Sequence, residues 1–396
     1  MFDKKALQAE MLSVLQDNIL SFWLDRMVDS ERGGFYGRIG GDGAVDADAP
    51  KGAILNARIL WAFSAAYRIT GREDYLAAAT RAERYLIDRF YDTQFGGVYW
   101  SLDAEGRPLD TRKQFYALGF ALYGLSEYVR ATGDREALRY AVALYDDIET
   151  RSRDRRCGGY IEAATRDWQP IEDMRLSAKD RNDCKSMNTH LHIIEPYTNL
   201  LRVWRNEELV ESVRSLLDTF ERHIVDPATG HLRLFFDEQW HPTSRIVSFG
   251  HDIEASWLLY EAATTVGDAE TVDRFGALAR RIAAAAAEGL QSDGSMIYES
   301  DAATGHSDTD RHWWVEAECV VGYYNLWQAF GDQEALDRSL AAWSYIKRHL
   351  IDDEGGEWWW SIRGDGSINR SDDKAGFWKC PYHNSRMVLE VYERLG

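Results

Sequence analysis

Two histidines are the side chains of this sequence best suited to moving protons. His251 and Glu254 stand three residues apart in FGHDIEASWLLYEAA, so both can point from one side of a helix and the carboxylate can orient the imidazole. His383 follows Trp378 in GFWKCPYHNSRM, where a loop leads into the last helix. Imidazoles change charge near neutral pH, so the pattern indicates general acid/base chemistry. An ordinary solvated His–Glu pair on a helix would show the same spacing.

Arg58 is a charged residue in an apolar helical stretch, KGAILNARILWAFSAAYRITG. Ile54, Leu55 and Trp61 lie on its own side of the expected helix. A guanidinium there is removed from water and cannot lose its proton, so it requires a carboxylate partner or an anion that forms during a reaction. Two interpretations therefore stand side by side: a buried ion pair, or a donor to a developing oxyanion.

The segment SMNTHLHIIEPYTNLL offers further polar groups on an apolar background. Asn188 and His192 are four residues apart and share a helix face, whereas His190 and His192 diverge by about 200° around the axis. The HxH pattern is therefore not predicted to chelate a metal from a helix. Pro196 either kinks this helix or marks its real beginning, which leaves the direction of His192 open.

Aromatic residues accompany these polar groups. Trp313 and Trp314 stand where a loop leads into a helix, in the same relation that Trp378 has to the last helix. Indole rings stack well on flat sugar faces, so tryptophans beside a histidine are typical of a sugar platform next to a proton-transfer group. Hydrophobic packing remains the alternative for any single tryptophan.

Six glycine-marked turns indicate the elements that must position these side chains. Each follows an expected helix and precedes a short aromatic or alternating run, and successive turns begin about 60 to 70 residues apart, at Gly33, Gly96, Gly158, Gly230, Gly294 and Gly355. This spacing accommodates two helices and a small hairpin. We therefore predict an all-α fold, an (α/α)6 barrel of six helix pairs with short β-hairpins at one end, as a single catalytic domain over residues 1–396. An open solenoid of helix pairs is the competing architecture.

The composition favours a small neutral ligand. The 396 residues carry a formal net charge of -19, which disfavours nucleic acid and anionic membrane surfaces as partners. No apolar run reaches membrane-spanning length, so we expect a cytoplasmic protein without membrane contact. The cysteines are scattered without a CxxC pair, which indicates neither a disulfide framework nor a thiolate zinc site. They are Cys157, Cys184, Cys319 and Cys380.

Six motifs, in order, resemble those of the cellobiose 2-epimerases, in the N-acylglucosamine 2-epimerase superfamily: KGAILNARILW, KQFYALGF, KSMNTHLHIIEPYTNL, FGHDIEASWLL, HWWVEAE and GFWKCPYHNSRM. The resemblance spans nearly the whole chain and implies the same (α/α)6 barrel. It implies an isomerase that inverts C2 of the reducing-end glucose of a β-1,4-linked disaccharide through an enediolate, converting cellobiose to glucosyl-mannose and lactose to epilactose. We expect neither a metal nor a nucleotide cofactor.

The resemblance also implies roles for individual residues. The implied catalytic residues are His251 and His383 as the acid/base pair, Glu254 as the holder of a histidine, and Arg58 as the oxyanion donor. The implied substrate-binding residues are Tyr116, Asp180, Asn188, His192, Trp314 and Trp378, of which the two tryptophans stack on the sugars.

Other functions are compatible with parts of this pattern. A glycoside hydrolase on the same barrel would need two cavity carboxylates, and a non-catalytic sugar-binding protein would use the tryptophans alone. A monosaccharide-acting member of the superfamily, an N-acetylglucosamine 2-epimerase or a mannose epimerase or isomerase, would share the fold and mechanism. The sequence leaves open which histidine serves which sugar face, and whether the protein is a monomer or a homodimer.

Overall fold

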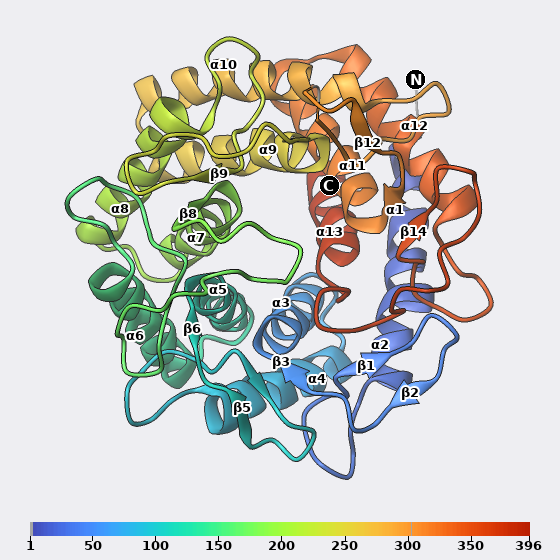
Figure 1. The fold of residues 1–396 in the computed structure, drawn as a ribbon. Helices are drawn as coiled ribbons and strands as arrows, with labels where there is room; N and C mark the ends of the chain where they lie inside the picture. Colours follow the sequence, from blue (N-terminus) through green and yellow to red (C-terminus); the bar gives the residue numbers. More distant parts are fainter. Residues whose placement is uncertain (1–2, 302) are drawn as a thin grey trace.

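The computed structural model describes residues 3–301 and 303–396, and helices in these ranges form two concentric rings (Figure 1). The inner ring consists of α3 (Ala53–Thr70), α5 (Phe115–Thr132), α7 (Met187–Leu201), α9 (Phe249–Val266), α11 (Trp313–Phe330) and α13 (His383–Leu395). Each inner helix packs against the next, and α13 packs against α3, which closes the ring. The predicted (α/α)6 barrel is confirmed, and the open solenoid is wrong.

The outer ring holds the partners of the inner helices. Its helices are α4 (Glu73–Tyr85), α6 (Arg135–Arg151), α8 (Glu207–Thr219), α10 (Ala269–Ala286) and α12 (Gln333–His349). The sixth outer position belongs to α1 (Lys4–Ser13), the π-helix η1 (Val14–Ile19) and α2 (Leu20–Arg26). Short turns extend three outer helices: η2 (Leu86–Phe90), η3 (Phe220–Ile224) and η4 (Ala287–Gly289). Because α1 packs against α13, the first and last helices of the chain belong to one pair.

The two rings differ in how the sequence distributes apolar residues. Inner helices are buried on nearly all sides, as α3 shows from Ala53 to Ala66, whereas an outer helix such as α8 buries one apolar face. Gly71 ends α3 in the left-handed conformation, as its position in the sequence predicts, because glycine adopts this conformation without a steric penalty. No helix in the described ranges is long and apolar enough to span a bilayer.

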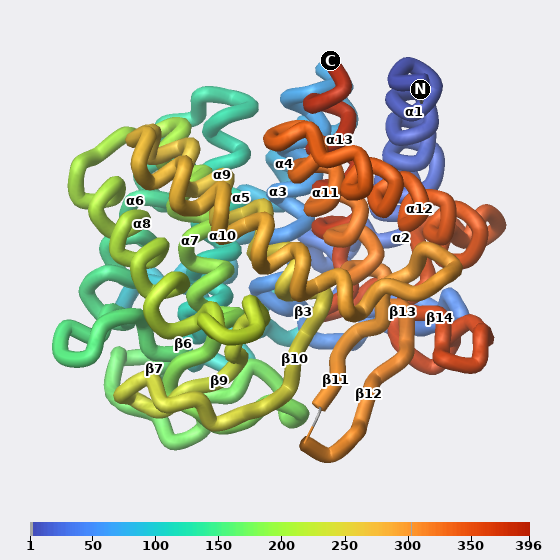
Figure 2. The backbone as a smooth tube through the Cα atoms, turned by 90° about the horizontal axis from the view of Figure 1, so that it is seen from above, coloured from blue at the N-terminus to red at the C-terminus, as the bar shows by residue number. Residues whose placement is uncertain are grey.

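Short antiparallel strands gather at one end of the barrel (Figure 2). The strands are β1 (Arg38–Ile39), β2 (Val45–Asp46), β3 (Lys51–Gly52), β4 (Ser101–Leu102), β5 (Pro108–Asp110), β6 (Lys113–Gln114), β7 (Ala163–Ala164), β8 (Lys185–Ser186), β9 (Phe235–Phe236), β10 (Val247–Ser248), β11 (Glu299–Asp301), β12 (His306–Asp308), β13 (Arg311–His312) and β14 (Ser361–Ile362). The sheets are β1-β2, β3-β4-β5, β6-β7, β8-β9, β10-β11-β12 and β13-β14. Since β3, β6, β8, β10 and β13 each lead directly into an inner helix, the sheets join consecutive helix pairs at the inner helices' N-terminal ends.

The glycine turns repeat one arrangement. Each closes with an isolated β-bridge, Val28–Phe35, Tyr91–Val98, Arg153–Tyr160, Val225–Leu232, Leu290–Met296 or Ile351–Trp358. In the first three turns a buried lysine just before the inner helix binds the aspartate of the turn, in the pairs Lys51–Asp29 at 2.7 Å, Lys113–Asp92 at 3.1 Å and Lys185–Asp154 at 2.8 Å. These ion pairs fix each turn to the start of its inner helix.

The fourth residue of three inner helices makes a related contact. His190 of α7 accepts a hydrogen bond at Nε2 from the backbone N–H of Tyr160 at 2.9 Å, and its Nδ1 donates to the carbonyl of Ser186 at 2.6 Å. Asp252 of α9 and Glu316 of α11 accept equivalent backbone N–H groups at 2.8 and 2.9 Å. Burial lowers the pKa of His190 to about 4, so this imidazole is a neutral structural group.

Candidate active site

The first two turns of the inner helices bring most of the predicted site residues to the centre of one end of the barrel. Each inner helix contributes, in the order Arg58 from α3, Tyr116 from α5, Asn188 and His192 from α7, His251 and Glu254 from α9, Trp314 from α11 and His383 from α13. Trp378 lies in the loop that leads into α13. Asp180 lies in the long loop before β8.

Arg58 is buried and has no carboxylate partner among the residues that the structure describes. Its Nη2 donates to the Tyr116 hydroxyl at 2.9 Å and its Nη1 lies 3.6 Å from Cys380 Sγ, while Nε has no hydrogen-bond partner within the described ranges. The guanidinium carbon lies 4.0 Å from the centre of the Phe120 ring and 4.8 Å from that of Tyr382. The ordinary buried ion pair, one of the two sequence interpretations, is therefore not formed. Ring faces and neutral acceptors surround a charge that retains capacity for an anion.

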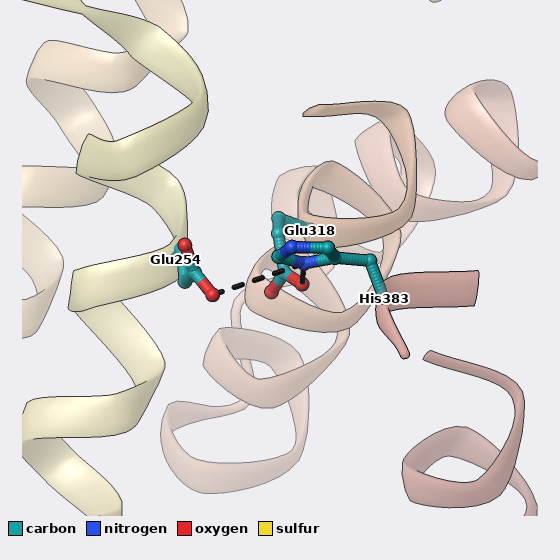
Figure 3. A group of neighbouring side chains, drawn as sticks. All are labelled: Glu254, Glu318 and His383. Carbon is teal, nitrogen blue, oxygen red and sulfur yellow. Dashed lines mark hydrogen bonds and ion pairs between the residues drawn. The ribbon is translucent and has the colours of Figure 1, made fainter. Parts of the chain in front are cut away.

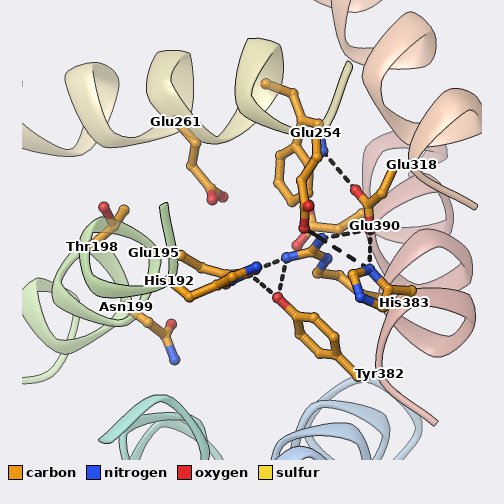
Figure 4. A network of polar contacts seen from close by, with 12 residues as sticks. His192, Glu195, Thr198, Asn199, Glu254, Glu261, Glu318, Tyr382, His383 and Glu390 are labelled. Carbon is orange, nitrogen blue, oxygen red and sulfur yellow. Dashed lines mark hydrogen bonds and ion pairs between the residues drawn. The ribbon is translucent and has the colours of Figure 1, made fainter. Parts of the chain in front are cut away.

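Arg386 is a second buried arginine, and it has the opposite surroundings. Its Nη2 donates to Glu254 Oε1 and to Glu318 Oε1, each at 2.6 Å, and its Nη1 contacts Glu195 and the Tyr382 hydroxyl. The whole side chain is 0% exposed. Figure 4 shows these acidic groups converging from α7, α9 and α11. One guanidinium thus binds three carboxylates drawn from three inner helices.

His383 is oriented by this acidic cluster. Its Nδ1 lies 2.7 Å from Glu318 Oε1 and 3.9 Å from Glu254 Oε1 (Figure 3). A hydrogen bond from Nδ1–H to Glu318 leaves Nε2 free for a substrate. Burial, together with Arg58 and Arg386, lowers the pKa of His383 below its ordinary range. Burial and the neighbouring Glu318 raise the pKa of Glu254, so the cluster as a whole can retain a proton near neutral pH.

His251 is held differently from the prediction. Its Nδ1 lies 2.7 Å from the Ser248 hydroxyl, while Glu254 turns toward Arg386 and His383, so the expected orientation of His251 by Glu254 is wrong. Burial lowers the pKa of His251 to about 3, which keeps its imidazole neutral.

One indole brings the two candidate acid/base histidines together. The Trp314 ring centre lies 4.7 Å from that of His251 and 5.7 Å from that of His383. Tyr298 packs edge-on against the same indole at 5.7 Å. The neutral imidazoles therefore share one aromatic wall.

The α7 side chains line another part of the wall. His192 Nδ1 lies 3.0 Å from Glu195 Oε2, and its ring packs edge-on against Tyr116 at 5.1 Å. The Asn188 carbonyl oxygen is buried without a partner in the described part of the chain. Pro196 lies within α7, so it does not mark the helix start.

Trp378 and Asp180 occupy separate positions around the site. The Trp378 ring centre lies 6.2 Å from that of Tyr116, the residue that accepts from Arg58, and 6.1 Å from that of Trp100. Asp180 accepts from the Ser177 N–H at 2.8 Å within its own loop, and it lines a small cavity together with Asn188.

The family model for N-acylglucosamine 2-epimerase (GlcNAc 2-epimerase) matches residues 34–385, about nine-tenths of the chain. The chain belongs to this family. A cellobiose 2-epimerase of Bacteroides fragilis is 60% identical over 97% of this chain and 98% of its own length. The structure of a cellobiose 2-epimerase from Bacillus thermoamylovorans B4167 matches with a TM-score of 0.94 at 40% identity, over 98% of this chain and 100% of that one. A D-mannose isomerase structure, at 21% identity and a TM-score of 0.85, shows the fold alone.

Four central residues of this epimerase-family site were not predicted from the sequence: Glu195, Glu318, Tyr382 and Arg386. Each stands inside or beside a motif that carries a predicted residue, for instance Arg386 three positions after His383 and Glu195 three after His192. Helical spacing of three or four residues is the signal that would have found them.

The cluster of Glu254, Glu318 and His383 has donor atoms close enough together to hold a metal ion. Arg386 Nη2 already lies 2.6 Å from both carboxylates. A cation of the protein itself therefore already lies against both carboxylates, and Glu318 binds His383 Nδ1 at 2.7 Å.

Proposed function

We propose that this chain is an epimerase that inverts C2 of the reducing-end glucose of a β-1,4-linked disaccharide, turning cellobiose into glucosyl-mannose and lactose into epilactose. One observation carries the proposal: two neutral imidazoles, of the half-buried His251 and the buried His383, pack against Trp314 at the same end of the barrel as a guanidinium with no carboxylate partner among the described residues. The Tyr382 ring contacts both groups: its centre lies 4.8 Å from the guanidinium carbon of Arg58 and 4.6 Å from the ring centre of His383. The cellobiose 2-epimerases among the relatives support the choice of substrate.

The first chemical step breaks the C2–H bond of the open-chain sugar. One neutral imidazole, His251 or His383, takes the proton, and the electron pair moves into the C1 carbonyl to form an enediolate. Negative charge grows on O1 only in the transition state, where Arg58 donates to it. Tyr116, which accepts from Arg58, holds that guanidinium at the correct angle.

The second step returns a proton to the opposite face of the planar enediolate. A single base cannot readily serve both faces, so the second histidine serves the other face. When His251 is the base, His383 gives its Nε2 proton to C2 while its Nδ1 takes up the proton held by the carboxyl cluster of Glu254 and Glu318, so that the imidazole stays neutral. The raised pKa of Glu254 keeps a proton within the acidic cluster beside His383. Reprotonation at C1 in place of C2 would give a ketose, so a small isomerase side activity is part of the proposal.

The remaining predicted residues bind the sugar. Asn188 presents an unpaired buried carbonyl oxygen, and His192 and Tyr116 present ring edges on the same wall. Trp314 and Trp378 provide faces for stacking on the two sugar rings. Asp180, which lines a cavity with Asn188, approaches the reducing sugar from its loop.

The site also bears on the hydrolase alternative. A glycoside hydrolase needs two carboxyl groups that flank the scissile bond. Glu254 and Glu318 both accept from one nitrogen of Arg386, each at 2.6 Å, so they lie side by side with their charge compensated. This arrangement favours proton transfer by histidine over glycoside cleavage.

Incubation with cellobiose in deuterium oxide, followed by proton NMR and mass spectrometry, tests the proposal. We expect glucosyl-mannose with deuterium at C2, and loss of the exchange in the His383→Asn and His251→Asn variants. His241→Asn, at an exposed histidine, is the matched control. Free glucose would identify a hydrolase, and turnover of N-acetylglucosamine or mannose without cellobiose turnover would move the substrate to a monosaccharide.

The proposal includes a cytoplasmic location, catalysis within one domain over residues 1–396, and a monomer or homodimer. Neither a metal nor a nucleotide takes part in the steps above. Full activity after dialysis against EDTA, with mass determination by light scattering, would agree with these points. Activity restored only by an added divalent cation would contradict them.

A further inference from the structure

The turn of the sixth helix pair differs from the first three turns at one backbone position. In those three, the second of two successive glycines is Gly34, Gly97 or Gly159, with φ of 63°, 66° and 73°. In the sixth, Gly356 at φ 73° is followed by Glu357 at φ 61°. A side chain in this left-handed region is strained. Such strain persists only where the surroundings compensate for it, and it often marks a functional position.

The glycines of the earlier turns have a packing reason. A Cβ atom at Gly34 would lie 2.7 Å from the ring of Tyr85, and one at Gly159 would lie 2.3 Å from that of Trp240. A side chain cannot fit beneath these rings. In the sixth turn the same position carries Glu357, which is 0% exposed.

The Glu357 carboxylate gathers donors from distant parts of the chain. Oε1 accepts from Lys379 Nζ at 2.7 Å, from Asn384 Nδ2 at 2.6 Å and from the Trp358 N–H at 2.8 Å. Oε2 accepts from the indole of Trp23 at 2.6 Å. These contacts compensate for the strained backbone and for the burial of the charge.

Two of these donors enclose the segment that carries the site. Lys379 and Asn384 stand at its ends, so one carboxylate fixes both ends of residues 379–384. Within the segment, Cys380 contacts Arg58, Tyr382 contacts Glu195, and His383 contacts Glu318. Within the described part of the chain, the Glu357 carboxylate binds none of these three residues, so it acts on them through the backbone between Lys379 and Asn384.

We propose that Glu357 is a positioning residue, which holds residues 379–384 so that the imidazole of His383 stands correctly for proton transfer. The inference rests on the proposed epimerase function for its catalytic consequence. The hydrogen bonds of Glu357 to Lys379 and Asn384 are a property of the folded chain and do not depend on that function.

The catalytic test replaces Glu357 by glutamine, which keeps the size and removes the charge. We expect kcat for cellobiose to fall about tenfold or more while KM changes little, because a misplaced base weakens the transition state more than substrate binding. Glu357→Asp, which keeps the charge, should recover part of the loss. Glu354→Gln, at an exposed residue of the same turn, is the matched control. A folded Glu357→Gln variant with the kcat of the parent would overturn the proposal.

A second variant covers the case in which the glutamine variant does not fold. Glu357→Gln combined with Lys379→Met leaves no unpaired ammonium in the core, so it should fold where the single variant fails. Its kcat should remain low because the two ends of the segment are no longer joined. Parental kcat in the double variant would contradict the positioning role.

A measurement without substrate separates this proposal from the proposed function. In protein labelled with 15N-histidine, the imidazole signals of His383, identified by their loss in His383→Asn, should shift in Glu357→Gln, while those of His190 stay in place. If the parent protein fails to turn over cellobiose but the His383 signals shift, the function is wrong and the positioning stands. Unchanged His383 signals in the folded variant would refute the positioning, whatever the substrate.

Discussion

Arg58 and Arg386 lie on inner helices of the same ring, and both are buried. Among residues 3–301 and 303–396, Arg386 has three carboxylate partners and Arg58 has none. Arg386 binds Glu195, Glu254 and Glu318. Arg58 lies among the rings of Tyr116, Phe120 and Tyr382, with a hydroxyl and a thiol as its polar neighbours. Arg386 therefore joins three neighbouring inner helices through their carboxylates, whereas Arg58 remains available to an anion.

This difference in surroundings suits Arg386 to stabilising the fold and Arg58 to the reaction. Removing one partner of a buried charge cluster leaves the others uncompensated, which is costly for the fold. Removing a buried charge that has no counterion takes away an unfavourable group, at the expense of function. Substitution of Arg386 should therefore lower the unfolding free energy, whereas substitution of Arg58 should lower kcat without that loss of stability.

Arg386→Met should destabilise the protein most, by about 3–5 kcal/mol of unfolding free energy, because buried carboxylates are left without their cation. Urea unfolding followed by circular dichroism measures the change. Arg338→Met, which breaks a surface pair with Glu334, is the control and should cost less than about 1 kcal/mol. Equal losses in the two variants would mean that the central cluster adds nothing to the fold.

Arg58→Met should leave unfolding free energy unchanged or increased, and should lower kcat by about 10²–10³-fold, the usual effect of losing an oxyanion donor. Initial epimerisation rates by NMR and urea unfolding of the same sample measure both quantities. A destabilisation as large as that of Arg386→Met would show that the two arginines contribute equally to stability, contrary to this prediction.

Gly119→Ala should push the inner helices α5 and α7 apart. A Cβ atom at Gly119 of α5 would lie 2.3 Å from the carbonyl oxygen of His192 on α7, so these helices must separate. We expect a loss of about 1–3 kcal/mol from this overpacking. Thermal and urea unfolding check it. An unchanged stability would show that α5 and α7 can shift freely, and that Tyr116 and Glu195 need no fixed separation.

Acid should weaken the fold through the buried imidazoles. The pKa of His251 falls from 6.5 in the unfolded chain to about 3 when folded, so the unfolded state binds more protons below pH 6.5 and stability decreases as pH falls. Between pH 7 and 5.5 this costs about 1 kcal/mol for one histidine. Glu254 acts in the opposite sense, since its raised pKa favours the protonated folded state as pH falls.

Comparison of the parent with His251→Asn cancels the contribution of Glu254. Urea unfolding at pH 7 and 5.5 should show a smaller loss in the variant. An equal loss in both proteins would indicate that His251 is protonated in the folded state.

The fold follows closely from local patterns in the sequence. The spacing of the six glycine turns and the helical periodicity between them predict the helix pairs, and Gly71 ends α3 as expected. The hairpins and their common end follow from the same repeats. Closure of the ring was inferred from the number of pairs, because contact between α13 and α3 has no local signal.

The site was predicted only in part, for a physical reason. Spacing of three residues places His251 and Glu254 on one helix face, but the direction of each side chain depends on groups that other helices supply. Arg386, 132 positions from Glu254, attracts that carboxylate away from His251. Two of the four unpredicted residues, Glu318 and Arg386, bind one another between the adjacent helices α11 and α13, and such a pairing cannot be read from either helix alone.

Closure of the ring also affects the order in which the chain becomes stable during synthesis. Asn18 donates to the carbonyl of Asp352, and Trp23 to Glu357, each across 334 positions. Because α1 packs on α13, α1 finds its partner only after residues 383–395 have been synthesised. Until then the buried side chains of α1, Leu7 and Met11, lack the helix against which they pack in the folded protein.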